Sequence, residues 1–348
     1  MAGPPFNLVT GATGFIGRHL VWQLLRSGAT VRVLCRSAQK ARTLFGDAVE
    51  IHEGDLDGSQ GEDRVASACR GIGNVYHLAG LYCFGWRNRA SLWRTNVEGT
   101  RRMLQAARRA GADRFVHCST AGILSARGRL ITREDRPARP PPGCAYKISK
   151  WHSEQEALCA AESGQPVVIA SPTAPIGSGD ERPTPTGQMI RDLMWGRFPG
   201  CTRTGLNLVA VEDVAQGLVA VARRGQPGRR YILGHENLWL EEFLSRVARR
   251  IGRPAPRAWI PFGLVAAAGI LNDVAGFVTG RGSDRVCWET AYFSRQRQFF
   301  DLQDTIEELG WRPQNRLDDS LDEAIAWFAP SAAGGQRAHP DSQAIAGP

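Results

Sequence analysis

Two residues in the stretch AYKISKWHSE, Tyr146 and Lys150, have the types and spacing of a proton donor with a cation beside it. Because they are four positions apart in a helical context, both side chains project from one face of one helix. An ammonium near a phenol favours the phenolate and is expected to lower the tyrosine pKa, so that the hydroxyl can exchange a proton with a substrate oxygen. The same spacing also occurs on exposed amphipathic helices, so other motifs must support this interpretation.

A third polar residue, Thr120, lies in HCSTAG at the end of a predicted strand upstream of that helix. Its hydroxyl can donate or accept a hydrogen bond at the same substrate carbonyl. The neighbouring Cys118 follows His117, but adjacent residues of a strand face opposite sides, so we expect a buried thiol and not a catalytic one. The eight cysteines are irregularly spaced without a Cys-x-x-Cys pair, which favours reduced thiols over disulfides and predicts no metal site.

A glycine-rich turn, TGATGFIGRHL, links the apolar run near the N-terminus to an apolar-periodic helix. Gly11, Gly14 and Gly17 lack a Cβ, so the backbone can turn tightly and approach a pyrophosphate. The free N–H groups of the first helical turn then point at the anion. This turn predicts a dinucleotide site, although any tight strand-to-helix turn can use glycine.

The first half of the chain alternates strand and helix patterns. Strands are predicted at 6–9, 30–34, 49–52, 74–78, 114–118 and 167–170. This rhythm predicts an α/β fold, a Rossmann-type doubly wound parallel sheet with helices on both faces and ligands at the carboxyl ends of the strands.

The rhythm stops near Ser171, where a loop rich in Pro, Gly and Ser begins. We expect a dinucleotide-binding core at 1–172 with a later strand returning near 206–234, and a smaller, mostly helical substrate-binding lobe at 173–330. Helical segments beginning at EDVAQGLVAVARRG are expected to help build that lobe. Residues 331–348 have few large apolar side chains and are predicted to be disordered.

Charge and composition limit the partners of this 348-residue chain. Its formal charge of +9 comes from dispersed arginines without a recognisable nucleic-acid module, so no nucleic-acid partner is expected. A basic surface still favours anions, such as a dinucleotide phosphate or acidic lipid headgroups. The first residues lack the pattern of a secretory signal, which predicts a cytoplasmic protein, with peripheral placement at the inner face of the membrane left open.

Taken together, the glycine turn, Thr120, Tyr146 and Lys150 resemble the motifs of the extended short-chain dehydrogenase/reductase family, and the likeness extends to about Phe328. EGDLDG, HLAG and Asn96 to Thr100 match further motifs of that family. The resemblance implies hydride transfer at a nicotinamide, with Tyr146 as acid/base, Thr120 orienting the oxygen, and Lys150 holding the nicotinamide ribose. The cofactor-binding residues are then expected to be Gly11, Thr13, Gly14, Phe15, Ile16, Gly17, Arg36, Asp55, Leu56, Leu78, Ala79, Gly80, Asn96, Tyr146, Lys150, Pro172 and Thr173.

Downstream stretches, among them RPTPTGQMIRDLMWGRFP and TGLNLVAVEDVAQG, resemble the branch called hopanoid-associated sugar epimerases, near dihydroflavonol reductases and 3β-hydroxysteroid dehydrogenases. Two positions favour a reductase over an epimerase. Arg36 stands where an acidic residue would bind the ribose of NAD, so NADP is favoured and NAD stays open. Leu206 stands where sugar-nucleotide enzymes of the family carry an arginine for the substrate diphosphate, and leucine offers that diphosphate no interaction.

The substrate is expected to be apolar, such as a sterol or hopanoid intermediate. The aromatic stretch GLYCFGW begins the pocket that the family uses, and ordinary packing of these rings is the alternative. The expected pocket residues are Tyr82, Phe84, Trp86, Thr120, Pro175 and Met189. The apolar segment 258–280 predicts either a buried helix pair or a membrane-touching patch.

We therefore expect an NADP-dependent oxidoreductase acting on a carbonyl or secondary alcohol of a polycyclic lipid. A sugar epimerase or dehydratase of hopanoid side-chain synthesis and a non-catalytic NADP-binding sensor are the alternatives. The family resemblance also implies a homodimer through helices near 101–110 and 146–161.

Overall fold

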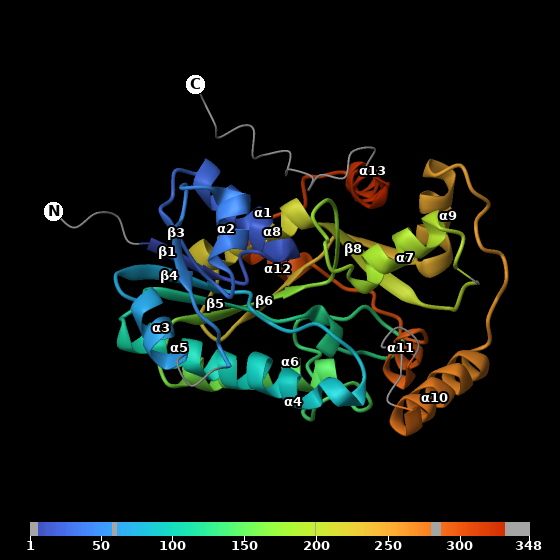
Figure 1. The fold of residues 1–348 in the computed structure, drawn as a ribbon, viewed down its shortest axis with the longest axis horizontal. Helices are drawn as coiled ribbons and strands as arrows, with labels where there is room; N and C mark the ends of the chain where they lie inside the picture. Colours follow the sequence, from blue (N-terminus) through green and yellow to red (C-terminus); the bar gives the residue numbers. More distant parts are fainter. Residues whose placement is uncertain (1–5, 58–60, 199, 280–286, 331–348) are drawn as a thin grey trace.

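The computed structural model describes residues 6–57, 61–198, 200–279 and 287–330, without the side chain of Trp86. The predicted disordered tail, 331–348, lies outside these residues. At the centre is a seven-stranded parallel sheet in the order β3-β2-β1-β4-β5-β6-β9 (Figure 1). Its strands are β1 (Phe6–Thr10), β2 (Val31–Cys35), β3 (Glu50–Glu53), β4 (Ile72–His77), β5 (Arg114–Cys118), β6 (Val167–Pro172) and β9 (Arg230–Leu233). The doubly wound parallel sheet and the six predicted strands are confirmed.

Helices cover both faces of this sheet, which explains why strands such as VRVLC and VVIASP are almost entirely buried. One layer contains α1 (Phe15–Arg26), α2 (Ala38–Phe45), α8 (Val211–Arg224) and α12 (Gln303–Leu309); the other contains α3 (Gly61–Ala68), α5 (Gly99–Arg109) and α6 (Ala145–Glu162) (Figure 1). The sequence EDVAQGLVAVARRG forms α8, which packs against α1. The expectation that this segment builds the smaller lobe is therefore wrong, because its apolar face completes the core of the large sheet.

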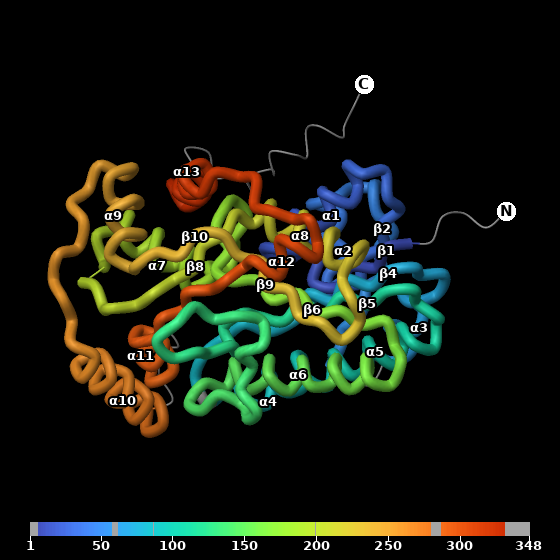
Figure 2. The backbone as a smooth tube through the Cα atoms, turned by 180° about the vertical axis from the view of Figure 1, so that it is seen from behind, coloured from blue at the N-terminus to red at the C-terminus, as the bar shows by residue number. Residues whose placement is uncertain are grey.

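The smaller lobe has its own three-stranded sheet in the order β10-β8-β7. Its strands are β7 (Ala174–Ile176), β8 (Gly205–Ala210) and β10 (Glu236–Trp239), and its helices are α7 (Pro185–Met194), α9 (Leu240–Arg250) and α13 (Leu317–Phe328) (Figure 2). Apolar residues of these elements, such as Leu208, Phe243 and Leu321, share one core. The predicted later strand near 206–234 is divided: β9 joins the large sheet and β8 joins this small one.

The apolar segment 258–280 contributes α10 (Phe262–Thr279), which lies beside α11 (Trp288–Phe293) at one edge of the molecule (Figures 1 and 2). Small residues face α11: a Cβ on Gly269 would lie 2.7 Å from the carbonyl oxygen of Cys287. The large apolar side chains point away from the protein, with Leu271, Phe277 and Val278 exposed by 69%, 73% and 75%. The alternative of a buried helix pair is therefore wrong. By length and composition, α10 is the single helix of the described residues that could cross a membrane.

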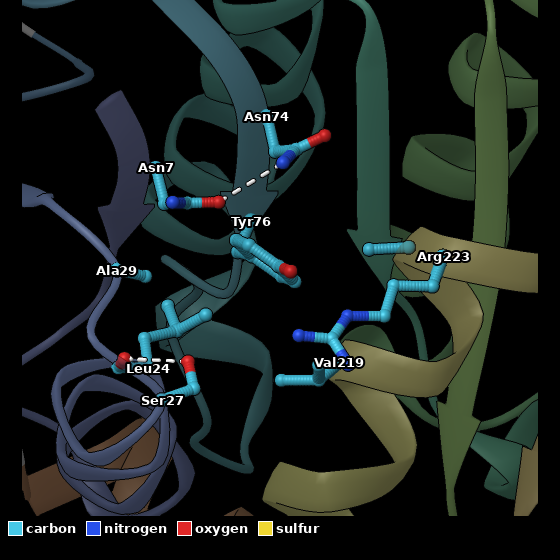
Figure 3. A pocket seen from close by; sticks show the side chains of 9 residues that line it. Asn7, Leu24, Ser27, Ala29, Asn74, Tyr76, Val219 and Arg223 are labelled. Atoms are coloured by element: carbon cyan, nitrogen blue, oxygen red, sulfur yellow. Dashed lines mark hydrogen bonds between the residues drawn. The ribbon is translucent and has the colours of Figure 1, made fainter. Parts of the chain in front are cut away.

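A hollow near the starts of β1 and β4 lies away from the predicted catalytic residues (Figure 3). Its lining includes Asn7 and Asn74, which hydrogen-bond each other at 3.0 Å, and Arg223 of α8. None of the predicted site residues lines it. Ligands of doubly wound sheets bind at the carboxyl ends of the strands, so we place the candidate site at the opposite end.

Candidate active site

The glycine turn between β1 and α1 has the close backbone contacts that a dinucleotide-binding turn requires. Gly11 has a φ of +70°, and a Cβ there would lie 2.7 Å from the backbone nitrogen of Ala79. A Cβ on Gly17 would lie 2.1 Å from the carbonyl oxygen of Gly11, so only glycine allows α1 to approach the turn this closely. Gly14 is the N-cap of α1 and has no side chain to cover the first N–H groups. These N–H groups, with Thr13, Phe15 and Ile16 around them, fit the pyrophosphate of a dinucleotide.

The ends of β2 and β3 carry the residues predicted for the adenosine half of a cofactor. Arg36 is exposed directly after β2, and the described part of the chain gives its guanidinium no hydrogen bond or ion pair. Asp55 follows β3 and accepts a hydrogen bond from the backbone N–H of Leu56 at 2.7 Å. Both side chains are therefore available at the carboxyl edge of the sheet.

After β4, the chain passes through Leu78, Ala79 and Gly80 along the glycine turn. The N–H of Ala79 donates to the hydroxyl of Thr10 at 3.1 Å, which fixes this passage to β1. Asn96 lies in the π-helical segment Trp93–Glu98 and is buried. Its amide bonds both backbone groups of Leu81 and donates to the Ser149 hydroxyl at 2.8 Å. Asn96 thus connects the loop after β4 to α6, and its direct contact with a cofactor stays a prediction.

The structure brings the three predicted catalytic residues together at the start of α6. Thr120 caps the short helix Ala121–Ile123 and hydrogen-bonds the half-buried Tyr146. Lys150 is buried, and its ammonium donates to the carbonyl oxygen of Cys118 at 2.7 Å. Pro172 ends β6 and Thr173 follows it, with its N–H on the Leu233 carbonyl oxygen, so both lie at the same edge of the sheet.

The expected lowering of the Tyr146 pKa is not found. Burial raises the pKa of Tyr146 above its usual value, and the nearby thiols of Cys118 and Cys144 act in the same direction. The hydrogen bond to Thr120 opposes this rise but is the smaller effect. Burial also lowers the pKa of Lys150. The removal of the phenol from water is the largest effect, so the neutral form of Tyr146 is favoured.

Aromatic side chains surround the Tyr146 ring. The centroid of the Tyr82 ring lies 4.4 Å from that of Tyr146, and the Phe84 ring lies 6.4 Å from it. Phe293 of α11 continues this group at 5.6 Å from Phe84. The contacts of Tyr82 and Phe84 agree with their predicted position at the catalytic tyrosine, whereas Phe293 was not predicted because only the fold brings α11 to this loop. The Trp86 side chain lies outside the described part of the chain.

A second unpredicted residue of α11, Glu289, connects two parts of the site. Its buried carboxylate accepts hydrogen bonds from the N–H of Ala145 at 2.8 Å and the N–H of Gly85 at 3.1 Å. The first of these contacts caps α6 one residue before Tyr146, where the helix dipole favours a negative charge. Burial raises the pKa of Glu289. Its sequence position, far from both partners, gave no signal for this role.

Two predicted pocket residues lie in the smaller lobe. Pro175 is on β7, and Met189 of α7 packs against the core of the lobe. Their contact with substrate stays a prediction. The eight cysteines are free, with Cys118 buried as expected, and the described residues include no group of three or more metal-ligating side chains.

A parallel sheet with a glycine turn at its switch point, and a Thr-Tyr-Lys set at its carboxyl edge, defines an NAD(P)-dependent oxidoreductase. A family model described as "NAD dependent epimerase/dehydratase family" matches residues 7–234, and the chain belongs to this family. A putative dihydroflavonol 4-reductase from Synechocystis sp. is 36% identical, over 92% of this chain and 93% of that protein. Sterol demethylase protein B of Methylococcus capsulatus is 31% identical, over 92% and 98%. The crystal structure of gox2253 has a TM-score of 0.79 and 33% identity, covering 93% and 98%.

The Tyr146 hydroxyl can be tested by removing it alone. Tyr146→Phe keeps the ring and its aromatic contacts, so we expect turnover to fall by about 100-fold or more while cofactor affinity changes little. The measurement is steady-state turnover of any secondary alcohol or ketone that the intact protein accepts, together with cofactor titration. Tyr231→Phe is the matched control, because its hydroxyl bonds Gln226 and Glu308 elsewhere. Normal turnover by Tyr146→Phe would show that the catalytic residue is misassigned.

Proposed function

We propose that this oxidoreductase transfers hydride between NADP(H) and a carbonyl or secondary alcohol of an apolar polycyclic substrate, such as a sterol or hopanoid intermediate. The observation that carries the proposal is the group of aromatic rings, Tyr82, Phe84 and Phe293, around the hydroxyl-bearing Tyr146. A flat ring system gains affinity by burying apolar area against such a wall. Two relatives, a putative dihydroflavonol 4-reductase and sterol demethylase protein B, are consistent with a multi-ring substrate.

The chemistry follows from the state of Tyr146. A bound nicotinamide would supply the hydride, and Tyr146, whose neutral form burial favours, would donate its proton to the substrate oxygen. Thr120 shares a hydrogen bond with that hydroxyl and can orient the same oxygen. Lys150 is placed to hold the nicotinamide ribose, one helical turn from Tyr146.

A nucleotide-sugar epimerase is the alternative, and β8 argues against it. Leu206 offers no charge to a diphosphate, and the amide of the adjacent Asn207 bonds Asn237 and the N–H of His235. A non-catalytic sensor of NADP, the other alternative, has no use for an intact Thr120, Tyr146 and Lys150. Both alternatives are decided by the next experiment together with turnover.

Thermal unfolding in the presence of NADP separates the substrate classes. We expect a C3-keto sterol to raise the melting temperature, because a ligand that binds only the folded state stabilises it, and we expect UDP, UDP-glucose and UDP-galactose to have no effect. The binding affinity of the sterol should come mainly from buried apolar area, at about 25 cal/mol per Å². Clear stabilisation by a UDP-sugar with none by the sterol would reject the reductase and support the epimerase.

The cofactor preference rests on Arg36. Its unpaired guanidinium at the end of β2 can bind a 2′-phosphate through two N–H groups, so we expect NADPH to bind more tightly than NADH. Arg36→Asp should remove or reverse this preference, at a cost of about 1.5–3 kcal/mol for the lost charged hydrogen bond. Fluorescence titration with both cofactors measures it, and Arg42→Asp on the exposed side of α2 controls for net charge. Equal affinities in the intact protein would show that Arg36 does not set the preference.

Two copies of the chain are proposed to pair through α5 and α6. These helices pack against each other on one face of the sheet, and an exposed ion pair joins Arg101 to Glu156 across them at 2.6 Å. A symmetric contact would place the same two helices of both copies in one bundle.

We also propose a cytoplasmic location, which fits the eight free thiols.

We further propose that α10 lies on the cytoplasmic surface of a membrane that contains anionic lipids. Its outward side chains are apolar, and Asp273, the one acidic residue in the helix, is turned inward to the N–H of Trp288 at 2.9 Å. Exposed arginines flank the helix: Arg257 precedes it, and Arg295 lies over the Phe262 ring at 5.0 Å. Apolar side chains with a basic rim fit an interface of acyl chains and acidic headgroups.

Other occupants of this surface fit less well. A symmetric contact between two copies of α10 would bring the same arginines of both copies together. A spanning orientation would require α10 to leave α11, against which Gly269 packs. A membrane contact at this place also suits the proposed substrate, because α11 connects α10 to the rings around Tyr146.

Vesicle binding by the full-length protein tests this surface. We expect binding to phosphatidylcholine vesicles that contain phosphatidylglycerol, weaker binding at high salt, and about tenfold or greater loss when Leu271→Glu and Phe277→Glu are combined, since charges replace buried apolar area. Leu130→Glu, at an exposed leucine elsewhere, is the control. Unchanged binding by the double variant would reject the surface. If the double variant were a monomer without lipid while the intact protein is a dimer, as measured by ultracentrifugation, the outer surface of α10 would instead be a protein interface.

A further inference from the structure

A buried ammonium group without an acidic partner lies one residue after the catalytic tyrosine. Lys147 is only 2% exposed, and its Nζ donates to the neutral amide oxygen of Gln296 at 2.6 Å. The same Nζ lies 4.0 Å from the centroid of the Phe293 ring. In the described part of the chain, no carboxylate comes within ion-pair distance of it. Burying a cation is costly unless an anion compensates it, so the local charge is left unbalanced.

The buried arginines in the described part of the chain do have carboxylate partners. Arg18 pairs with Glu181 at 2.6 Å, and Arg32 pairs with Glu50 at 2.9 Å. Arg230 shares the buried carboxylate of Glu154. Lys147 differs from these arginines and resembles Lys150, whose buried ammonium donates to the carbonyl oxygen of Cys118 at 2.7 Å. Burial lowers the pKa of Lys147 to about 8, so the group still carries its charge at neutral pH.

The choice of lysine is unusual for this chain. Of its 43 basic residues only three are lysines, Lys40, Lys147 and Lys150, and the other 40 are arginines. Two of the three lysines thus lie in the site, in one helical turn. A lysine places a compact point charge where the planar fork of an arginine needs more room.

Lys147 lies beside the turn that follows Thr120 and over the ring of Phe293. Its Cε lies 3.9 Å from where a Cβ on Gly122 would be, and the N–H of Gly122 donates to the Thr120 hydroxyl. Phe293, under the ammonium, contacts Phe84, and Phe84 in turn approaches the ring of Tyr146. Lys147 and Tyr146 therefore reach the same aromatic wall from neighbouring positions of α6. With one N–H on Gln296, the ammonium has further donors for a ligand.

We propose that Lys147 is the anion-binding residue of the substrate pocket, and that the substrate carries a carboxylate near its reacting carbon. This inference rests on the proposed function and narrows its substrate class from an apolar ring system to an acid built on one. A carboxylate bound here would balance the buried charge of Lys147. The aromatic rings would contact the apolar part of the substrate, and Tyr146 would donate its proton to the carbonyl oxygen that is reduced.

Matched pairs of an acid and its methyl ester test the proposal on the full-length protein with saturating cofactor. The probes are a hydroxysteroid bearing a ring carboxylate, cyclohexanecarboxylate, and the methyl ester of each. We expect the intact protein to bind each acid more tightly than its ester, and Lys147→Met to weaken acid binding by about tenfold or more with ester binding changed less than about twofold. Lys40→Met, at the lysine paired with Glu181 outside the pocket, should keep the acid-to-ester ratio.

The two pairs of probes separate this inference from the proposed function. If Lys147→Met weakened the binding of acid and ester equally, the role of Lys147 would be its structural hydrogen bond to Gln296, and the proposal would be overturned. Equal affinities of the intact protein for an acid and its methyl ester would also overturn the proposal. If only the cyclohexane pair shows the difference, the anion site stands and the steroid class fails. Lys147→Gln, with its unfolding temperature measured, replaces Lys147→Met if that variant does not fold.

Discussion

The buried carboxylate of Glu154 fixes the helix on which the whole site depends. It is fully buried and accepts hydrogen bonds from the Ser119 hydroxyl after β5, from Arg136 at 2.8 Å, and from Arg230 of β9. Removing one partner of such a buried group leaves uncompensated charge and typically costs about 3–5 kcal/mol, so α6 is held firmly against the sheet. Tyr146 and Lys150 precede Glu154 on the same helix, and their distance from the glycine turn is set by this anchor.

The other end of α6 is held from a distant part of the chain. Glu289 of α11 caps the helix at Ala145 and also holds Gly85 of the aromatic loop. The same short helix packs against α10, whose outer face is apolar and exposed. The C-terminal region thus contributes to the catalytic helix, the substrate wall and the outer surface through one element. Through Phe293 and Phe84, α11 connects α10 to the ring of Tyr146.

Local rules were sufficient for part of this architecture. The glycine turn, the six strands and the Tyr146–Lys150 pair follow from spacing along a few residues, and the structure has them where the sequence predicts them. The layer to which α8 belongs could not be predicted, because its apolar face suits either the small lobe or the large sheet. Glu289 and Phe293 could not be found either, since their partners lie in the first half of the chain. The direction of the Tyr146 pKa was mispredicted because burial, which a spacing rule does not measure, outweighs the nearby cation.

Burial also explains how one short helical segment can carry three different roles. Tyr146 is kept neutral by removal from water, and that state is the one needed to donate a proton. The ammonium of Lys150 donates a hydrogen bond to the carbonyl oxygen of Cys118, at the end of β5. Lys147 contacts Phe293 and Gln296, and none of the described carboxylates lies within ion-pair distance of it. In a low-dielectric site both ammonium groups act more strongly on an anion than they would in water. The arrangement supports the proposal that Lys150 acts on the cofactor and Lys147 on the substrate, with Tyr146 as the proton donor between them.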